Sequence, residues 1–436
     1  MSDDVALAIN GGPKAAPTDP GPAQSWPIIT EEDEKAVLEV LRRRAMSGRD
    51  VTLEFEKEYA EWHGVEYALG HSSGTAALQA AMWACGVGIG DEIIAPSMTY
   101  WATALPVFSL QGTMVYGDVH PDTLTLDPED IEHRITERTK AIIPVHLGGY
   151  PADMDPIMEI AERHGIKVIE DVSHAHGASY KGRVLGTIGH VGCFSIMSGK
   201  ALATGEGGIL ITNDRYIWEK ATAWGHHGRT SSIRWAADMD EPVITEPDLL
   251  PYKGMPMGGY KYRMHQLTSA VARVQLKYYR PRMEEILKAM NYFWDLLEDV
   301  PGLQAHRPAK DSGSHMGGWY APRGIYKAEE LNGLPLDKYA AAVQAEGGVC
   351  SGSGRRGGLH LHPLMQTADI YGHGKPTRIA NSEWDVREGD KSLPVTEMEG
   401  RIYGIPWFKH YWRDVIEEQA AAYRKVAEKA DEVPRE

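Results

Sequence analysis

The chain has 436 residues, of which 42% are hydrophobic and 24% are charged, and its formal net charge is −16 at pH 7. This length allows a large buried core and favours two domains of unequal size. The acidic balance argues against a broad binding surface for nucleic acid or for an anionic membrane. It still allows a local phosphate site, which needs only a few N–H groups and one cation.

Cysteine usage and the first residues indicate the compartment. The chain has an odd number of cysteines, three, and they are widely spaced: Cys85, Cys193 and Cys350. This pattern argues against a disulfide framework and fits a reducing cytosol. Residues 1–4 are acidic and lack the apolar stretch of a signal peptide. No apolar run reaches the length of a membrane-spanning helix. We therefore expect a soluble, cytoplasmic protein.

The first elements are an arm and two helices. Residues 1–29 are rich in glycine, proline and alanine, which predicts an extended arm with little helix. Thr30 and the acidic residues 31–33 predict a helix start, because a hydroxyl cap and acids in the first turn favour one. Aromatic residues at helical spacing predict a second, short amphipathic helix over residues 55–62.

From residue 67 onward, short apolar segments alternate with helix-like segments. This alternation predicts an α/β domain with a mostly parallel, centrally buried sheet. We expect strands at residues 67–69, 92–95, 113–116, 141–145, 167–169 and 208–211. We expect helices at residues 75–83, 102–110, 128–135, 157–163 and 214–223.

The remaining chain predicts a second domain. Residues 228–262 are loop-like, and a long periodic helix is expected from about 265 to 297. Residues 350–395 are again loop-heavy, and a final helix is expected over 413–430. The predicted division is an arm (1–29), a large cofactor-binding domain (30–280) and a smaller C-terminal α+β domain (281–436).

Two residues carry the chemistry of this sequence. An apolar run ends in Asp171, and a loop of small residues later delivers Lys200. Pyridoxal 5'-phosphate needs such a pair, because a buried acid holds its ring nitrogen and a lysine forms the Schiff base. Ligands of open α/β sheets bind at the carboxyl ends of strands, where Asp171 is expected. A helix-capping acid and a solvated surface lysine remain open as alternatives.

Two further segments suit a phosphorylated, flat cofactor. Residues 72–75 precede a helix start, whose N–H groups and hydroxyls favour a phosphate group, although plain N-capping explains them equally well. Tyr100 follows another expected strand and either stacks on a flat ring or enters the core. The histidine pairs at 174/176, 226/227 and 360/362 form no ligand trio with an open position, so we expect no metal.

The ordered motifs resemble the DegT/DnrJ/EryC1/StrS aminotransferases. The resemblance covers residues 30–430 and rests on residues 73–78, 144–147, 168–171, 194–195, 200–208 and 259–264. It implies the fold-type I fold of pyridoxal-phosphate-dependent transferases, which is aspartate aminotransferase-like. It also implies a homodimer whose active sites are shared across the interface.

The resemblance implies a role for four residues around the cofactor ring. Lys200 would hold the cofactor covalently and move the proton between the Cα and C4′ positions, and Asp171 would pair with the pyridine nitrogen. Tyr100 would stack on the ring, and His174 falls on a position that faces the ring or its O3′ atom.

Four more residues fall on phosphate-binding positions of the family. Gly74, Thr75 and Ser195 would bind the phosphate within one subunit. Lys261 lies where the family often has an asparagine that reaches the phosphate from the neighbouring subunit, and a cation suits a phosphate.

The resemblance also implies a reaction. Relatives that remove a hydroxyl carry histidine in place of Lys200, so transamination is favoured. Residues 10–14, 194–200 and 405–410 are more similar to the keto-cyclitol branch, which aminates scyllo-inosose or 2-deoxy-scyllo-inosose, than to the nucleotide-sugar branch. The expected reaction moves an amino group from glutamine or glutamate to a ketone on a cyclitol or sugar, in antibiotic or amino-sugar biosynthesis.

Several alternatives stay open from the sequence. They are a keto-sugar-nucleotide aminotransferase, a synthase or dehydratase with the same cofactor such as an aminohydroxybenzoate synthase, and a non-catalytic regulator. The second domain offers five candidate substrate contacts, for which a solvated loop is an equal alternative: Arg355, Arg356, His360, His362 and Lys409.

Overall fold

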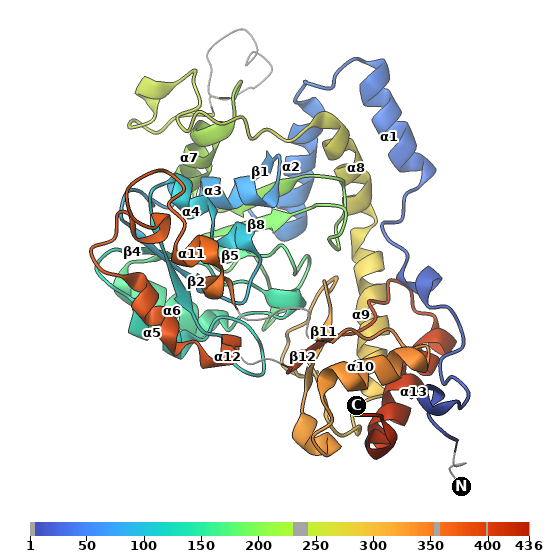
Figure 1. The fold of residues 1–436 in the computed structure, drawn as a ribbon. Helices are drawn as coiled ribbons and strands as arrows, with labels where there is room; N and C mark the ends of the chain where they lie inside the picture. Colours follow the sequence, from blue (N-terminus) through green and yellow to red (C-terminus); the bar gives the residue numbers. More distant parts are fainter. Residues whose placement is uncertain (1–4, 230–242, 353–357, 398–399, 436) are drawn as a thin grey trace.

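The computed structural model describes residues 5–229, 243–352, 358–397 and 400–435. A seven-stranded sheet forms the centre of the larger domain, with strand order β1-β9-β8-β5-β4-β2-β3 (Figure 1). Strand β9 runs antiparallel to both neighbours, and the other pairs are parallel. The strands are β1 (Tyr67–His71), β2 (Glu92–Pro96), β3 (Thr113–Gly117), β4 (Thr139–Ile142), β5 (Lys167–Asp171), β8 (Val191–Ser195) and β9 (Gly208–Thr212). The expected α/β fold with a mostly parallel sheet is confirmed.

Helices cover both faces of this sheet. Val168 and Ile169, adjacent in β5, lie in two different hydrophobic cores because successive side chains of a strand point to opposite faces. The helices of this domain are α1 (Glu31–Arg42), α2 (Asp50–His63), α3 (Gly74–Ala84), α4 (Pro106–Ser109), α5 (Pro128–Arg134), α6 (Met154–His164), α7 (Arg215–Gly225) and α8 (Gln266–Lys277). A short hairpin joins β6 (Ser179–Tyr180) to β7 (Arg183–Val184).

Three local expectations are wrong. Residues 191–195 were not expected as a strand, yet they form β8 because hydrogen bonds to β5 and β9 outweigh their mixed composition. The helix expected over 102–110 is a single 3-10 turn followed by the four-residue α4, since Pro106 cannot donate a helical hydrogen bond. The single helix expected over 265–297 is two helices that meet at Tyr278.

The second core lies in the C-terminal part of the chain. Helix α9 (Tyr279–Asp295) runs from the large domain into it, as Figure 1 shows. This second core contains Phe293, Trp319 and Tyr423, all fully buried. Its elements are the antiparallel sheet β10 (Leu303–Ala305), β11 (Arg323–Tyr326) and β12 (Ile402–Gly404), with α10 (Leu336–Ala345) and α13 (Arg413–Glu428). The division at 280/281 stays a prediction.

The N-terminal arm lies along this second core and ends at the large domain (Figure 1). Ala8 and Ala15 donate backbone N–H groups to the two carboxylate oxygens of Glu346, at 2.7 and 2.9 Å. Further along the arm, the indole N–H of Trp26 donates to the carbonyl oxygen of Lys200 at 3.1 Å. The arm therefore connects the small domain to the residue that the sequence singled out.

A second segment connects the two parts of the chain, this time from the C-terminal part to the large domain. Ser351 and Gly404 exchange two backbone hydrogen bonds of 3.1 Å, and the chain between them crosses to the large domain. We call its described part, residues 358–397, the excursion; it contains α11 (Pro363–Gln366) and α12 (Pro394–Glu397) between 3-10 turns. The excursion covers the outer side of the edge strand β3, where Arg378 donates to the Met114 carbonyl oxygen at 2.8 Å (Figure 1).

No helix in the part of the chain that the structure describes has the length and apolar character needed to cross a membrane.

Candidate active site

Asp171 is the last residue of β5 and is 5% exposed. Its carboxylate accepts hydrogen bonds from the Thr103 hydroxyl at 2.8 Å and from the Ser173 N–H at 3.1 Å. Two donors leave lone pairs of this buried carboxylate available for a cationic partner. The helix-capping alternative is thereby excluded, because Asp171 precedes a loop and not a helix.

Lys200 lies in the loop between β8 and β9 and is 7% exposed, which excludes the solvated surface lysine. Its Nζ atom lies 3.8 Å from the centre of the Tyr320 ring. Burial lowers the pKa of Lys200 to about 8, and the negative charge of Asp171 opposes this by raising it. The two side chains are therefore within electrostatic reach of each other, as a cofactor site requires.

Tyr320 brings a third residue to Lys200. The rings of His174 and Tyr320 have their centres 4.5 Å apart, and His174 Nδ1 accepts a hydrogen bond from the Gly148 N–H at 3.4 Å. Tyr320 belongs to the loop before β11, and its sequence neighbourhood contains no motif that points to the site. Sequence reasoning missed it, as it missed Thr103 and Trp26.

The start of α3 and the end of β8 form the expected phosphate site. A Cβ atom added to Gly74 would lie 2.7 Å from the Cβ atom of Ser195, so the helix start packs directly on the strand end. Ser73 caps the helix by accepting from the Ala76 N–H at 3.1 Å. The first N–H groups of α3, from Gly74 and Thr75, therefore lie next to Ser195, where the helix dipole favours an anion.

Tyr100 lies at a cavity wall and not in the core. It is 48% exposed, and its ring centre lies 5.0 Å from that of Trp101. Both residues line a cavity of about 900 Å³, together with Trp407 of the segment after β12. Trp407 in turn contacts Tyr320, with ring centres 5.6 Å apart. The cavity thus lies next to the aromatic residue that covers Lys200.

Lys261 has an exposed side chain, so its role stays a prediction about a neighbouring subunit. The next residue, Tyr262, accepts a backbone hydrogen bond from Ser72 at 2.7 Å, which places this segment beside the start of α3. Within one chain, the described contacts of Lys261 include neither Lys200 nor Asp171.

Two of the paired histidines contact backbone oxygens. His176 and His226 are buried and contact the backbone oxygens of Ser195 and Gly70, at 2.8 and 3.0 Å. Burial lowers the pKa of His176 to about 4. Among the described residues, no three histidine, cysteine or carboxylate side chains are grouped to hold a metal ion.

The candidate substrate contacts of the second domain separate into three groups. Arg355 and Arg356 lie outside the described residues. His362 is exposed and lines the cavity, whereas His360 is 1% exposed and hydrogen-bonded on both sides. Lys409 is 4% exposed beside the Trp407 ring, and burial lowers its pKa to about 6.

The lowered pKa of Lys200 predicts a pH profile. Because burial brings this pKa to about 8, the neutral, nucleophilic amine dominates above that pH. The rate constant for recombination of the apo-enzyme with pyridoxal phosphate should rise about tenfold between pH 7 and pH 9 and then level off. Stopped-flow absorbance at several pH values measures it. A rate that keeps rising about tenfold per unit up to pH 10 would contradict the lowered pKa.

The residues present fit pyridoxal phosphate. Gly74 leaves no space for a side chain between the start of α3 and Ser195, which suits close approach of a phosphate to backbone N–H groups. The buried carboxylate of Asp171 needs a cationic partner, and the lowered pKa of Lys200 makes its amine a better nucleophile near neutral pH than an ordinary lysine.

This fold and this site define the fold-type I class of pyridoxal-phosphate-dependent transferases. The acid ends strand β5 of the central sheet, and the lysine lies in the loop before β9 of the same sheet. A sequence model of the DegT/DnrJ/EryC1/StrS aminotransferase family matches residues 27–332, and the chain belongs to this family. The protein is therefore a pyridoxal-phosphate-dependent aminotransferase, as the resemblance implied.

Known relatives differ in the substrate or product that their names give. The chain is 31% identical to the L-glutamine:scyllo-inosose aminotransferase of Streptomyces griseus, over 99% of this chain and 100% of that relative. It is 43% identical to the L-glutamine:2-deoxy-scyllo-inosose aminotransferase of Streptomyces fradiae, over 48% of this chain and 50% of the relative. It is 39% identical to a GDP-perosamine synthase of Caulobacter vibrioides, over 54% and 58% of the two chains.

A solved structure supports the fold. The aminotransferase from Psychrobacter cryohalolentis superposes with a TM-score of 0.76 at 28% sequence identity, covering 93% of this chain and 99% of that one.

Proposed function

We propose that the protein transfers an amino group from glutamine or glutamate to a ketone on a cyclitol ring, of the scyllo-inosose or 2-deoxy-scyllo-inosose type. The observation that supports this best is the similarity to the scyllo-inosose aminotransferase of Streptomyces griseus, which extends over both chains from end to end. The role would be in the biosynthesis of an aminocyclitol antibiotic or an amino sugar.

The residues of the site would divide the work between them. Bound pyridoxal phosphate supplies an acceptor for the electron pair that remains when a proton leaves Cα of the amino donor. Lys200 would hold the cofactor until the amino group of the donor takes its place, and the amine freed in this way would take the proton from Cα and deliver it to C4′. The carboxylate of Asp171 would hold a proton on the ring nitrogen. The amino donor would react first and the ketone second. In the second half-reaction the same proton transfers would occur in reverse.

The other site residues would fix the position of the cofactor. Gly74, Thr75 and Ser195 would bind its phosphate, and Tyr100 and His174 would contact its ring. Thr103 acts on the ring only through Asp171, to which it donates a hydrogen bond of 2.8 Å.

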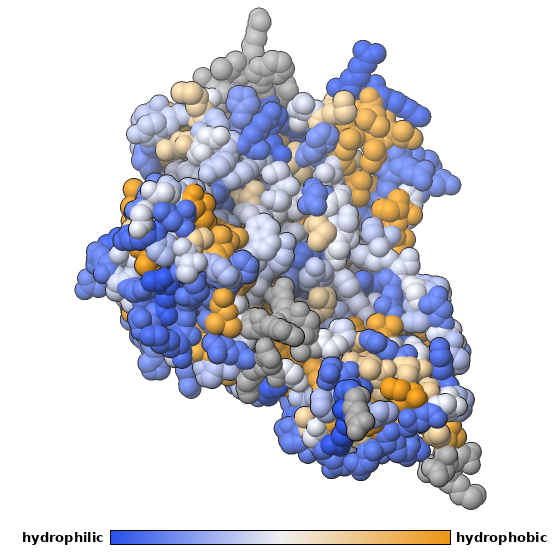
Figure 2. Space-filling model, viewed as in Figure 1, coloured by the Kyte–Doolittle hydropathy of each residue, from blue (hydrophilic) through white to orange (hydrophobic). Residues whose placement is uncertain are grey.

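The active form would be a cytoplasmic homodimer. Figure 2 shows hydrophobic side chains along α1 at the upper right, and Leu38 and Leu41 of this helix are each 42% exposed. Lys261 would reach the phosphate of the partner subunit, where a cation is favoured. Analytical ultracentrifugation is expected to give twice the chain mass of 48.2 kDa, and a single-chain mass at micromolar concentration would refute the dimer.

A ketone panel tests the proposed function. The pyridoxamine form of the enzyme is mixed with scyllo-inosose, 2-deoxy-scyllo-inosose and keto-sugar nucleotides, and the return of the aldehyde form is followed by absorbance. The proposal predicts that a keto-cyclitol reacts fastest. The similarity to a GDP-perosamine synthase makes a keto-sugar nucleotide the second candidate, and its preference in the panel would overturn the cyclitol assignment. Loss of water without gain of an amine would indicate a synthase or dehydratase.

A further inference from the structure

The excursion reaches the cavity beside the active site. Leu359, His362 and Thr396 of the excursion line the same cavity as Ser97 and Tyr100. The family match ends at residue 332, before the excursion begins. Part of the cavity wall therefore comes from a segment beyond the residues that the family model matches.

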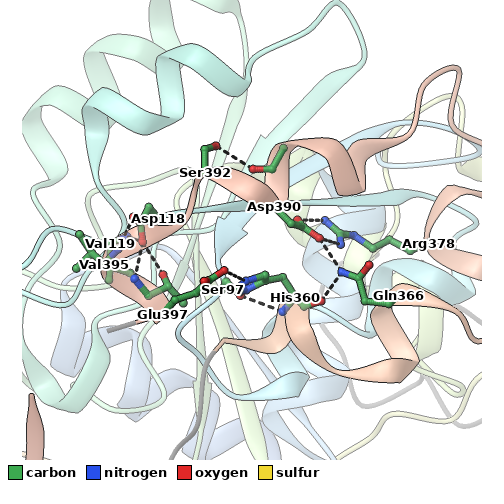
Figure 3. Close-up of polar contacts among 12 residues, drawn as sticks. Ser97, Asp118, Val119, His360, Gln366, Arg378, Asp390, Ser392, Val395 and Glu397 are labelled. Carbon is green, nitrogen blue, oxygen red and sulfur yellow. Dashed lines mark hydrogen bonds and ion pairs between the residues drawn. The ribbon is translucent and has the colours of Figure 1, made fainter. Parts of the chain in front are cut away.

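A hydrogen-bonded cluster of Ser97, His360 and Glu397, which we call the clamp, holds this wall in place. Figure 3 shows Ser97, His360 and Glu397 pointing toward one another. His360 Nδ1 lies 2.6 Å from the Ser97 hydroxyl, and its Nε2 lies 3.0 Å from a carboxylate oxygen of Glu397. Since a carboxylate only accepts, Nε2 carries the hydrogen, and in that tautomer Nδ1 accepts from Ser97. The Ser97 oxygen also accepts from the backbone N–H of His360 at 3.0 Å.

The clamp connects the excursion to the cofactor site. Ser97 begins the loop that carries Tyr100 at the cavity and Thr103 on Asp171. Gly358 has no space for a side chain, because an added Cβ atom would lie 2.4 Å from the Ser97 hydroxyl oxygen. A shift of the excursion at His360 would therefore shift this loop.

His362 offers a free donor at the cavity. Its Nδ1 atom accepts from the Leu364 N–H at 3.1 Å, so Nε2 of the neutral ring carries the hydrogen. The hydroxyls of Ser97 and Thr396 are committed to His360 and Asp118. Among the described residues of the excursion that line the cavity, His362 is the only one with an unpartnered polar side-chain atom.

The part of the cavity lining that comes from the excursion differs in charge from the rest of the lining. The cation Arg323 comes from β11, and the described lining residues of the excursion are uncharged or neutral histidine. A donor amino acid brings a carboxylate, which prefers a cation, whereas a polyhydroxylated ring brings hydroxyl oxygens, which accept from N–H groups. The excursion therefore suits the ketone better than the amino donor.

We propose that the excursion forms the wall that recognises the ketone acceptor, with His362 Nε2–H donating to a ring hydroxyl. His360 is a positioning residue that holds this wall against the loop of residues 97–103. The ligand class is an uncharged, polyhydroxylated ring ketone. The choice of a ring ketone as the ligand rests on the proposed function. The experiment does not, because it uses whichever ketone the wild type prefers.

Two substitutions of His362 separate recognition from folding. His362→Asn keeps a side-chain acceptor for the helix cap of α11 and replaces the ring Nε2–H with the N–H groups of a shorter amide, whereas His362→Ala removes both acceptor and donor. The two half-reactions are measured apart, with glutamine on the aldehyde form and with the best ketone of the panel on the pyridoxamine form. Both variants should raise the KM for the ketone about tenfold. The donor half-reaction should stay within about twofold.

Further variants test the clamp. Glu383→Gln cuts an exposed ion pair of the excursion with Arg138 and should leave both half-reactions unchanged. His360→Gln, which still offers an acceptor and a donor, should keep more of the ketone affinity than His360→Ala. If His362→Asn binds the ketone like the wild type, or if both half-reactions weaken equally, the proposal is overturned. Because the acceptor is whichever ketone the wild type uses, failure of the cyclitol assignment is a separate result.

Discussion

Replacing Lys200 with alanine is expected to lower kcat at least about 10³-fold and to leave the fold intact. The buried amine is the only group we assign to the proton transfer at the donor Cα, and no other described lysine lies against Tyr320. Removing a buried amine whose pKa is lowered by burial also relieves a cost of folding at neutral pH, so the apo-variant should melt no lower than the wild type.

A matched control separates this effect from the loss of any partly buried lysine. Lys220 in α7 also has its pKa lowered by burial and lies 4.9 Å from the Trp83 ring, away from the cofactor site. Lys220→Ala should retain kcat within about twofold. Steady-state transamination and circular dichroism measure both variants. Wild-type turnover by Lys200→Ala would remove this lysine from the mechanism.

Asp171→Asn is expected to lower kcat at least about 10²-fold, because the neutral amide no longer favours a proton on the ring nitrogen. The amide oxygen can accept from the Ser173 N–H and the amide NH2 can donate to the Thr103 hydroxyl oxygen, so the local structure should survive. The charge of Asp171 raises the pKa of Lys200, so its removal should move the recombination profile of the apo-enzyme to lower pH.

Thr103→Val tests how much the hydrogen bond to Asp171 contributes, apart from the charge of Asp171. It removes one hydrogen bond of 2.8 Å and leaves the charge, so the loss in kcat should be smaller, about tenfold. Activity of Asp171→Asn within about twofold of the wild type, with an unchanged pH profile, would contradict the assignment.

Local pattern pointed to the two central residues, although it left a helix-capping acid and a surface lysine open as alternatives. Asp171 ends an apolar run, Lys200 follows a small-residue loop, and residues 72–75 precede a helix start, so each is visible in a short stretch of sequence. The predicted sheet is confirmed for the same reason, since buried strands are short apolar runs. The roles of Gly74, Thr75, Ser195, Lys261 and His174 came from the family resemblance and stay predictions.

Long-range packing explains what was missed. Trp26 and Tyr320 meet the loop of Lys200 from positions more than a hundred residues away, and no periodicity encodes such a contact. The pair His360 and His362 was first considered for metal binding. The structure instead commits His360 to Ser97 and Glu397 and leaves His362 at the cavity, a difference that depends on tertiary contacts alone.

Reductive trapping followed by peptide mapping tests the central assignment most directly. The enzyme is saturated with pyridoxal phosphate, treated with borohydride and digested, and the modified lysine is located by mass spectrometry. We predict one modification per chain, on the peptide that contains Lys200. A modification on Lys261 or Lys409, or no trapped lysine at all, would contradict the site described above.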